Sequence, residues 1–142
     1  MPTNWEVELS EEFKQGAELT RTGPADSSKS FHPIQYHFHT PSEHTVNGDL
    51  MDAELHVVHK ALDGSYAVVA YFFDTTDSDE TSSDFLDDFF KGYSTDGSFN
   101  ASEIDFSKLL NEVDHEFVWM YDGSFTTPPC TEGVKWTLVK EI

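Results

Sequence analysis

Hydrophobic and polar residues alternate along several short stretches of the chain, which is the pattern expected of half-buried β-strands. On this basis strands are predicted at residues 5–9, 34–39, 52–60, 117–121 and 134–139. The run from Tyr66 to Phe73 is largely apolar and rich in residues that favour strands. A continuous apolar run of this length predicts a buried strand at the centre of a sheet.

The segments between these strands carry the signals of loops and short helices. Residues 20–30 are rich in Gly, Pro and Ser and are expected to form an exposed loop. Residues 74–84 are acidic and rich in Ser and Thr, which predicts a loop that ends in a helix N-cap. Apolar residues at 85, 86, 89 and 90 then have helical spacing, with Gly92 as a suitable stop. A further turn or short helix is expected at 104–111.

Three histidines lie where two neighbouring strands would direct them to one point. Because successive side chains of a strand point to opposite faces, His37 and His39 share a face. His56 lies on the next predicted strand, and the intervening Asn47-Gly48 is typical of a tight hairpin turn. Three neutral imidazoles that leave a fourth position open are the ligand set of a catalytic zinc site. The pattern therefore predicts that the chain binds Zn²⁺.

Polar residues on the same faces support the metal interpretation. Gln35 shares a face with His37, and Glu54 shares a face with His56. A metal-bound imidazole usually gives its other N–H to an amide, a carboxylate or a carbonyl, and both residues are placed for that role. The alternative is that these are ordinary strand histidines. Two at alternate positions, followed by a third on the expected partner strand, favour the metal site.

The composition limits the size of the domain and the kinds of partner that the protein can have. The chain has 142 residues, which is enough for one mostly β domain, residues 1–142, with a real core. Its 27 acidic and 8 basic residues give an acidic protein with a formal net charge of −19. This charge repels nucleic acid and anionic membranes, so neither is an expected partner. No stretch approaches the roughly 20 apolar residues of a membrane span, and no signal peptide is expected within this chain.

Four motifs, read together and in order, give the chain a resemblance to a known family. They are Gln35-Tyr-His-Phe-His39, Ser42-Glu-His-Thr45, Ala53-Glu-Leu-His-Val-Val-His59 and Tyr121-Asp-Gly-Ser-Phe-Thr-Thr-Pro-Pro-Cys130. These motifs closely resemble those of the α-class carbonic anhydrases, and the resemblance covers nearly the whole chain. It implies the fold of that family, a central twisted, largely antiparallel sheet with a few short helices.

The resemblance also implies roles for particular residues. The residues that match the zinc ligands are His37, His39 and His56, and those that match the partners orienting two of their rings are Gln35 and Glu54. The residues that match a gatekeeping carboxylate–hydroxyl pair are Glu43 and Thr126, and Thr127 matches a position beside the substrate. The residues that match the apolar wall of the carbon dioxide pocket are Val58, Val68, Phe125, Val134 and Trp136.

The implied activity is the zinc-dependent, reversible hydration of carbon dioxide to bicarbonate and a proton. In that family zinc hydroxide attacks the carbon of CO₂, and neutral ligands leave the metal charge undiminished for acidifying its water. An ionised Glu43 only accepts hydrogen bonds, so Thr126 must donate to it. The Thr126 oxygen then accepts the proton of the hydroxide, which turns a lone pair toward CO₂. An apolar recess suits CO₂ because that molecule is uncharged.

The chain departs from the family pattern in three respects. It is shorter than the family's catalytic domain and is expected to be truncated at both ends. The histidine that shuttles protons in fast members would align with Thr3 or with residues upstream of the chain, so slow turnover is expected. Cys130 matches one half of a disulfide of secreted relatives, and its partner is missing. This match suggests a secreted, periplasmic or lumenal protein.

Two other interpretations remain open from the sequence. His37, His39 and Glu43 loosely fit the first metal motif of the cupins, but the later His115 lacks the setting of their fourth ligand. The second alternative is a non-catalytic binding or structural module with the carbonic anhydrase fold, because the short chain lacks strands that follow in the family. The presence of all three zinc-matching histidines favours the enzyme. The sequence does not predict an oligomeric state.

Overall fold

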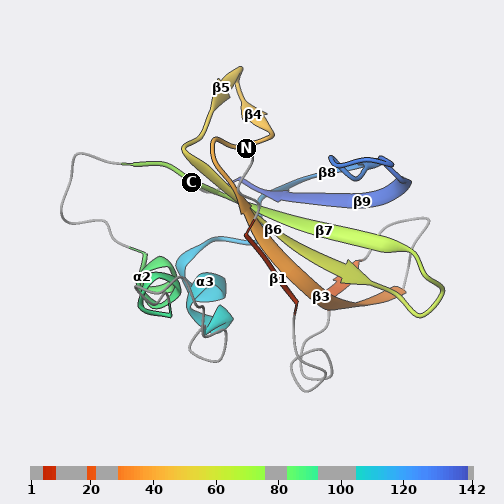
Figure 1. The fold of residues 1–142 in the computed structure, drawn as a ribbon, viewed down its shortest axis with the longest axis horizontal. Coiled ribbons are helices and arrows are strands. Elements are labelled where there is room, and N and C mark those ends of the chain that lie inside the picture. Colours follow the sequence, from red (N-terminus) through yellow and green to blue (C-terminus); the bar gives the residue numbers. More distant parts are fainter. Residues whose placement is uncertain (1–4, 9–18, 22–28, 76–82, 93–104, 141–142) are drawn as a thin grey trace.

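A seven-stranded β-sheet forms the body of the protein in the computed structural model, which describes residues 5–8, 19–21, 29–75, 83–92 and 105–140 (Figure 1). Its strands are β1 (Trp5–Glu8), β2 (Leu19–Arg21), β3 (Lys29–His39), β6 (Ala53–Lys60), β7 (Tyr66–Phe73), β8 (Val118–Ser124) and β9 (Glu132–Val139). The order across the sheet is β1-β3-β6-β7-β9-β8, and β2 pairs with β3 off this path. Among the described strands, only β7 and β9 pair in parallel. The predicted mostly β, largely antiparallel fold is confirmed.

The strand period divides the core into two layers, one on each face of the sheet. The first layer is made of Tyr36, Leu55, Val57, Val69, Tyr71, Phe85, Phe89, Leu109 and Val139. The second layer is made of Met51, Val58, Val68, Ala70, Phe72, Val134, Trp136 and Leu138. The helices α2 (Asp84–Lys91) and α3 (Phe106–Glu112) pack side by side and cover the first layer (Figure 1). The second face of the sheet therefore carries an apolar cluster that neither helix covers.

Helix α2 begins and ends where the sequence predicts. Ser83 is the N-cap, and its hydroxyl oxygen accepts a hydrogen bond from the backbone N–H of Leu86 at 3.1 Å. Glu112 of α3 accepts from the Ser83 hydroxyl at 2.7 Å and from the Phe85 N–H at 3.0 Å, which ties the two helices together. Gly92 is the C-cap. Within the described part of the chain, neither helix has the length and apolar character needed to cross a membrane.

The predicted tight turn at Asn47-Gly48 is present, but it joins different strands from those expected. Both residues have positive φ, 55° and 97°, as a two-residue hairpin turn requires. The turn connects β4 (Thr45–Val46) to β5 (Asp49–Leu50), a separate two-stranded sheet at the end of β3 and β6. The strands β3 and β6 still pair antiparallel, so the connection between them is longer than predicted while their pairing is as expected.

The expectation that residues 20–30 form an exposed loop is wrong at both of its ends. Strand β2 pairs antiparallel with the start of β3, and Leu19 lies opposite Phe31. Phe31 is buried against Ala61 and Ala67, so packing of this single phenylalanine extends β3 to five residues before Ile34. Polar composition alone could not show this, because the decisive contacts come from residues far along the chain. Residues 22–28 lie outside the described residues.

A buried histidine on β6 predicts acid sensitivity of the fold. His59 is 8% exposed and donates its Nδ1–H to the carbonyl oxygen of Val57 at 2.9 Å. Burial, with a smaller contribution from nearby His32, lowers the pKa of His59 to about 4 despite this hydrogen bond. An unfolded chain has an ordinary histidine pKa of about 6.5. Between these values the unfolded chain binds a proton that the folded chain does not, so stability falls as pH drops below about 6.5.

We expect His59→Gln to remove part of this pH dependence. Metal-free wild type should lose about 2 kcal/mol more free energy of unfolding than the variant between pH 7.5 and 4.5. Urea unfolding of both proteins at the two pH values measures this difference. The comparison cancels the ordinary acid titration of the other groups, and parallel stability curves for the two proteins would contradict the assignment to His59.

Candidate metal centre and adjoining pocket

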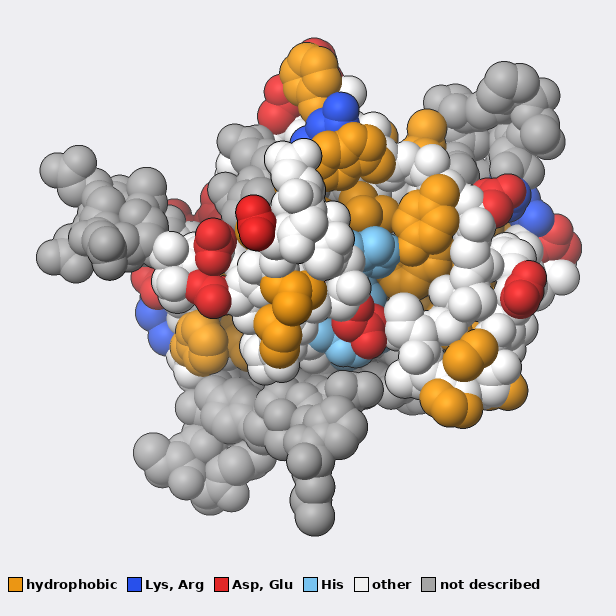
Figure 2. All heavy atoms as spheres, turned by 90° about the horizontal axis from the view of Figure 1, so that it is seen from above, with side chains coloured by type: hydrophobic (Ala, Val, Ile, Leu, Met, Phe, Trp, Pro, Cys, Tyr) orange, Lys and Arg blue, Asp and Glu red, His pale blue; other side chains and the backbone are white. Residues whose placement is uncertain are grey.

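The three predicted histidines converge on one point of the open face. In the register of β3 and β6, His37 lies directly opposite His56. The ring centroids of His37, His39 and His56 are 4.7 to 5.1 Å apart, and their ligand nitrogens all lie within 4.8 Å of one another. Figure 2 shows histidine side chains at the bottom of a hollow in this face, bordered by hydrophobic side chains. The sequence prediction that these three side chains meet is thus matched by the geometry.

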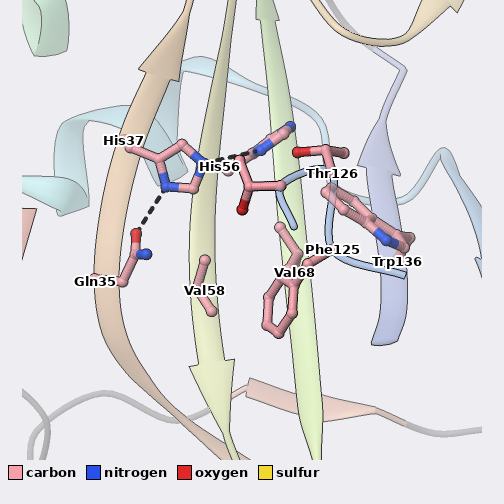
Figure 3. Close-up of a pocket in the computed structure, with 9 residues that line it drawn as sticks. Gln35, His37, His56, Val58, Val68, Phe125, Thr126 and Trp136 are labelled. Atoms are coloured by element: carbon pink, nitrogen blue, oxygen red, sulfur yellow. Dashed lines mark hydrogen bonds between the residues drawn. The ribbon is translucent and has the colours of Figure 1, made fainter. Parts of the chain in front are cut away.

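Hydrogen bonds fix which ring nitrogen of each histidine faces the centre. The Nδ1–H of His37 donates to the amide oxygen of Gln35 at 2.7 Å, so its Nε2 carries a lone pair (Figure 3). The Nε2–H of His56 donates to the carboxylate of Glu54 at 2.7 Å, so its Nδ1 carries a lone pair. These two lone-pair nitrogens face each other at 3.2 Å. Two acceptors at this distance repel each other unless a cation lies beside them, which is the arrangement of a metal site.

Burial keeps two of these rings, His37 and His39, neutral and therefore able to bind a metal. Burial, reinforced by the charges of His56 and His39, lowers the pKa of His37 to about 3. Burial also lowers the pKa of His39. A proton competes with a metal for the same lone pair, so a depressed pKa removes that competition at neutral pH.

His39 supplies a further sign that the site fits a metal ion. Its Nε2 is buried and, among the described residues, has no hydrogen-bond partner. A buried polar atom without a partner is costly, and a metal ion bound there would satisfy it. The nearest carboxylate oxygen, Oε2 of Glu43, lies 3.4 Å away. Three neutral imidazoles converging in this way match the ligand set of zinc.

The predicted pair of Glu43 and Thr126 is only partly assembled. Thr126 lines the pocket that adjoins the histidines (Figure 3). The hydrogen bonds described for this structure include none between the Thr126 hydroxyl and the Glu43 carboxylate. The Glu43 carboxylate lies instead beside His39, 3.4 Å from its Nε2. The gatekeeping role of the pair stays a prediction.

A small pocket of about 90 Å³, lined by apolar and polar side chains, opens beside the histidines. Its lining residues are Gln35, His37, His56, Val58, Val68, Phe125, Thr126, Thr127 and Trp136. Trp136 is held in place by its indole N–H, which donates to the carbonyl oxygen of Ser124 at 3.0 Å. Ligand pockets for drug-sized molecules are roughly 300–1,000 Å³, so this one suits a molecule of a few atoms. The predicted wall residue Val134 does not line it, but packs behind Val68 and Trp136.

Sequence reasoning assigned no role to two residues that join the site. His44 contacts the Glu54 carboxylate through Nδ1 at 2.5 Å, and its Nε2 lies 2.6 Å from the hydroxyl of Tyr121. The only local signal for His44 was its place between Glu43 and the turn. Nothing near Tyr121 in the sequence points to a residue 77 positions away.

The remaining sequence predictions concern residues outside the histidine group or outside the described residues. His115, the fourth ligand in the cupin alternative, lies 3.3 Å from the Tyr71 hydroxyl, and Tyr71 belongs to the layer under the helices. It is therefore not a member of the histidine group, which argues against a cupin. Thr3, at the position of the proton shuttle, lies outside the described residues. Cys130 is exposed and free, and the secreted, periplasmic or lumenal location that it suggested stays a prediction.

Comparison with known proteins bears on the identity of the site. Residues 3–142 match the family of eukaryotic-type carbonic anhydrases. The chain is 40% identical over 114 residues to Alpha carbonic anhydrase 4 from Arabidopsis thaliana, covering 79% of this chain and 40% of that protein. It is also 38% identical over 122 residues to Dioscorin dioA3 from Dioscorea japonica, covering 81% and 44%. The chain thus spans less than half the length of these relatives.

The fold is shared with solved structures of the same family. The structure of the alpha carbonic anhydrase from the fungus Aspergillus oryzae superimposes with a TM-score of 0.76 at 34% sequence identity. The match covers 96% of this chain and 55% of the fungal chain. The sheet is therefore that of a recognised architecture.

Proposed function

Because this chain belongs to the eukaryotic-type carbonic anhydrase family, we propose that it catalyses the reversible hydration of carbon dioxide with a bound zinc ion. His37, His39 and His56 would hold the ion. The observation that carries the proposal is the group of three histidine nitrogens within 4.8 Å, with the unpartnered Nε2 of His39 among them. A pocket of about 90 Å³ beside the group offers room for CO₂.

Zinc bound by neutral imidazoles lowers the pKa of water to roughly 7, an effect for which carbonic anhydrase is the standard example. The residues around the ion would orient the ligand rings. Gln35 fixes the ring of His37, and Glu54 fixes the ring of His56, each by a hydrogen bond of 2.7 Å. Rings that are already held in this orientation lose little side-chain freedom when the metal binds, and this strengthens metal binding.

The other residues hold the substrate and direct a proton. Val58, Val68 and Phe125 line the pocket with apolar atoms, which suits an uncharged molecule and disfavours ordered water. The Thr126 hydroxyl would donate to Glu43 once the site is loaded, and its oxygen would then accept the proton of the attacking solvent molecule. That direction of the proton turns the solvent lone pair toward CO₂ in the pocket.

The direct test is a measurement of zinc content and of CO₂ hydration on the same sample. We expect about one zinc per chain, as for any three-histidine site, and hydration activity by stopped flow in imidazole buffer, which carries protons away from the site. Chelation should remove both, and added zinc should restore both. Hydration that is independent of zinc, or a folded chain that takes up no zinc, would contradict the proposal.

Replacing Thr126 by alanine should slow hydration while zinc content stays unchanged. The change removes a hydrogen bond to a charged group, worth about 1.5–3 kcal/mol, and so we expect a loss of roughly 10- to 100-fold in kcat/KM. Thr126→Ser keeps the hydroxyl and is expected to retain most of the activity. Equal kcat/KM for wild type and Thr126→Ala would show that the hydroxyl has no orienting role.

A second candidate, alongside the similarity to a dioscorin, is the non-catalytic binding or structural module that the sequence left open, which keeps the fold without hydrating CO₂. The same measurements separate the two candidates. A chain that binds zinc stoichiometrically but shows no hydration above background in imidazole buffer is the result that this second candidate predicts.

A further inference from the structure

The carboxylate of Glu54 is the most heavily hydrogen-bonded group of the metal centre. It is fully buried. Its Oε2 accepts from the backbone N–H groups of Glu43 at 2.9 Å and His44 at 2.8 Å. Its Oε1 accepts from the rings of His44 at 2.5 Å and His56 at 2.7 Å. Four hydrogen bonds donated to one carboxylate, two of them from backbone N–H groups, favour its ionised form.

This carboxylate determines the proton positions of two histidines at once. An ionised carboxylate only accepts, so both rings must donate to it. His44 then carries its proton on Nδ1 and a lone pair on Nε2, which accepts the hydroxyl proton of Tyr121 at 2.6 Å. His56 carries its proton on Nε2, which leaves its Nδ1 free for the metal. One continuous hydrogen-bonded network, with Glu54 accepting from both sides, therefore links Tyr121 and His44 to the metal ligand His56.

Aromatic contacts hold this hydrogen-bonded network in place. The ring of Tyr121 stacks on Trp136 with an interplanar angle of 6° and a centroid distance of 6.0 Å. The His44 ring makes T-shaped contacts with Trp136 and with Phe72, with ring-centroid distances of 5.1 Å and 6.3 Å. Tyr121 is 41% exposed, so the hydrogen-bonded network starts at the surface and ends at the buried ligand His56.

We propose that His44 and Tyr121 are positioning residues that retain zinc by fixing Glu54 and, through it, the metal-binding tautomer of His56. The inference rests on the proposed function of the site. Without the His44 ring, Oε1 of Glu54 has one donor in place of two, and the two backbone N–H groups at Oε2 alone hold the other end of the carboxylate. The constraint that keeps the His56 proton on Nε2 and its lone pair toward the metal is then weaker. Partners that hydrogen-bond directly to a metal ligand, as Glu54 does here, change affinity by roughly 10- to 100-fold in other metalloproteins, and His44 acts one step further out.

The test is the rate at which zinc leaves the loaded protein in excess chelator. We expect His44→Ala to release zinc up to about 10-fold faster than wild type, at the lower end of the effect of losing a direct partner of a ligand. His44→Gln, whose amide can donate to Glu54, should recover most of the difference. Tyr121→Phe keeps the ring on Trp136 and deletes only the hydroxyl, so a smaller, several-fold increase is expected.

Two further readouts separate positioning from a general loss of structure. Thermal melting of the metal-free variants shows whether they fold. The visible spectrum of the Co²⁺-substituted proteins reports the ligand geometry, and it should change in His44→Ala and return toward wild type in His44→Gln. If His44→Ala does not fold, Tyr121→Phe decides the matter.

A folded His44→Ala or Tyr121→Phe protein with the zinc release rate and cobalt spectrum of wild type would overturn the inference for that residue. Such a result leaves the proposed function intact, because wild type still binds zinc and hydrates CO₂. A wild-type chain that binds no zinc would overturn both.

Discussion

Replacing His56 by alanine is expected to weaken zinc binding on the order of 1,000-fold or more and to abolish hydration of CO₂. The change removes one of three ligands together with the ring that Glu54 orients. Loss of an orienting partner alone costs roughly 10- to 100-fold, and loss of the ligand itself must cost more. The remaining His37 and His39 come from one strand and cannot enclose an ion between two strands. Zinc content after dialysis and stopped-flow hydration measure the two effects.

His59→Gln is the matched control for this experiment. His59 lies on the same strand and is equally buried, but it bonds to the Val57 carbonyl and is not a member of the histidine group. The control should keep one zinc and full activity. If His56→Ala and His59→Gln lost zinc to the same degree, the effect would come from damage to β6 and not from ligand loss.

Replacing Val68 by phenylalanine is expected to reduce hydration by about 100-fold or more with zinc still bound. Val68 is 1% exposed on the central strand β7 and lines the pocket beside the histidines. A phenylalanine ring there would fill much of the roughly 90 Å³ cavity and displace the substrate from the reacting group. Misplacement by about 1 Å is enough to lose on the order of 100-fold in rate. Inserting the larger side chain should also cost about 1–3 kcal/mol of stability.

Val68→Ala controls for the change at this position without blocking the pocket. It enlarges the cavity and should destabilise the fold while leaving much more activity than the phenylalanine variant. Zinc content and kcat/KM for both variants, measured well below their melting temperatures, distinguish the cases. Similar activity in Val68→Phe and wild type would place the substrate elsewhere.

The sequence predicted the histidine group because strand parity is a local property. His37 and His39 must share a face of any regular strand, and a partner strand that carries His56 could only meet them in one register. The same reasoning placed Gln35 and Glu54 beside the rings, where the structure has them. The central strand β7 was equally predictable from its composition.

Contacts that depend on distant segments were beyond the sequence. Strand β2 pairs with the start of β3, where Phe31 is buried against Ala61 and Ala67, and the polar residues around Phe31 in the sequence do not predict this burial. The contact between His44 and Tyr121 joins residues 77 positions apart, and no spacing rule covers it. The turn at Asn47-Gly48 was read correctly as a turn, but its dipeptide cannot say how long the strands on either side will be.

The opposition of His37 and His56 across β3 and β6 has a consequence for assembly of the sheet. A slip of β3 by one residue against β6 would exchange the faces of all β3 side chains, placing Phe38 in the hollow and His37 under the helices. Only one alignment brings three imidazoles together. An ion bound by these imidazoles, as proposed above, would stabilise that alignment, so zinc present during folding would favour it over its competitors.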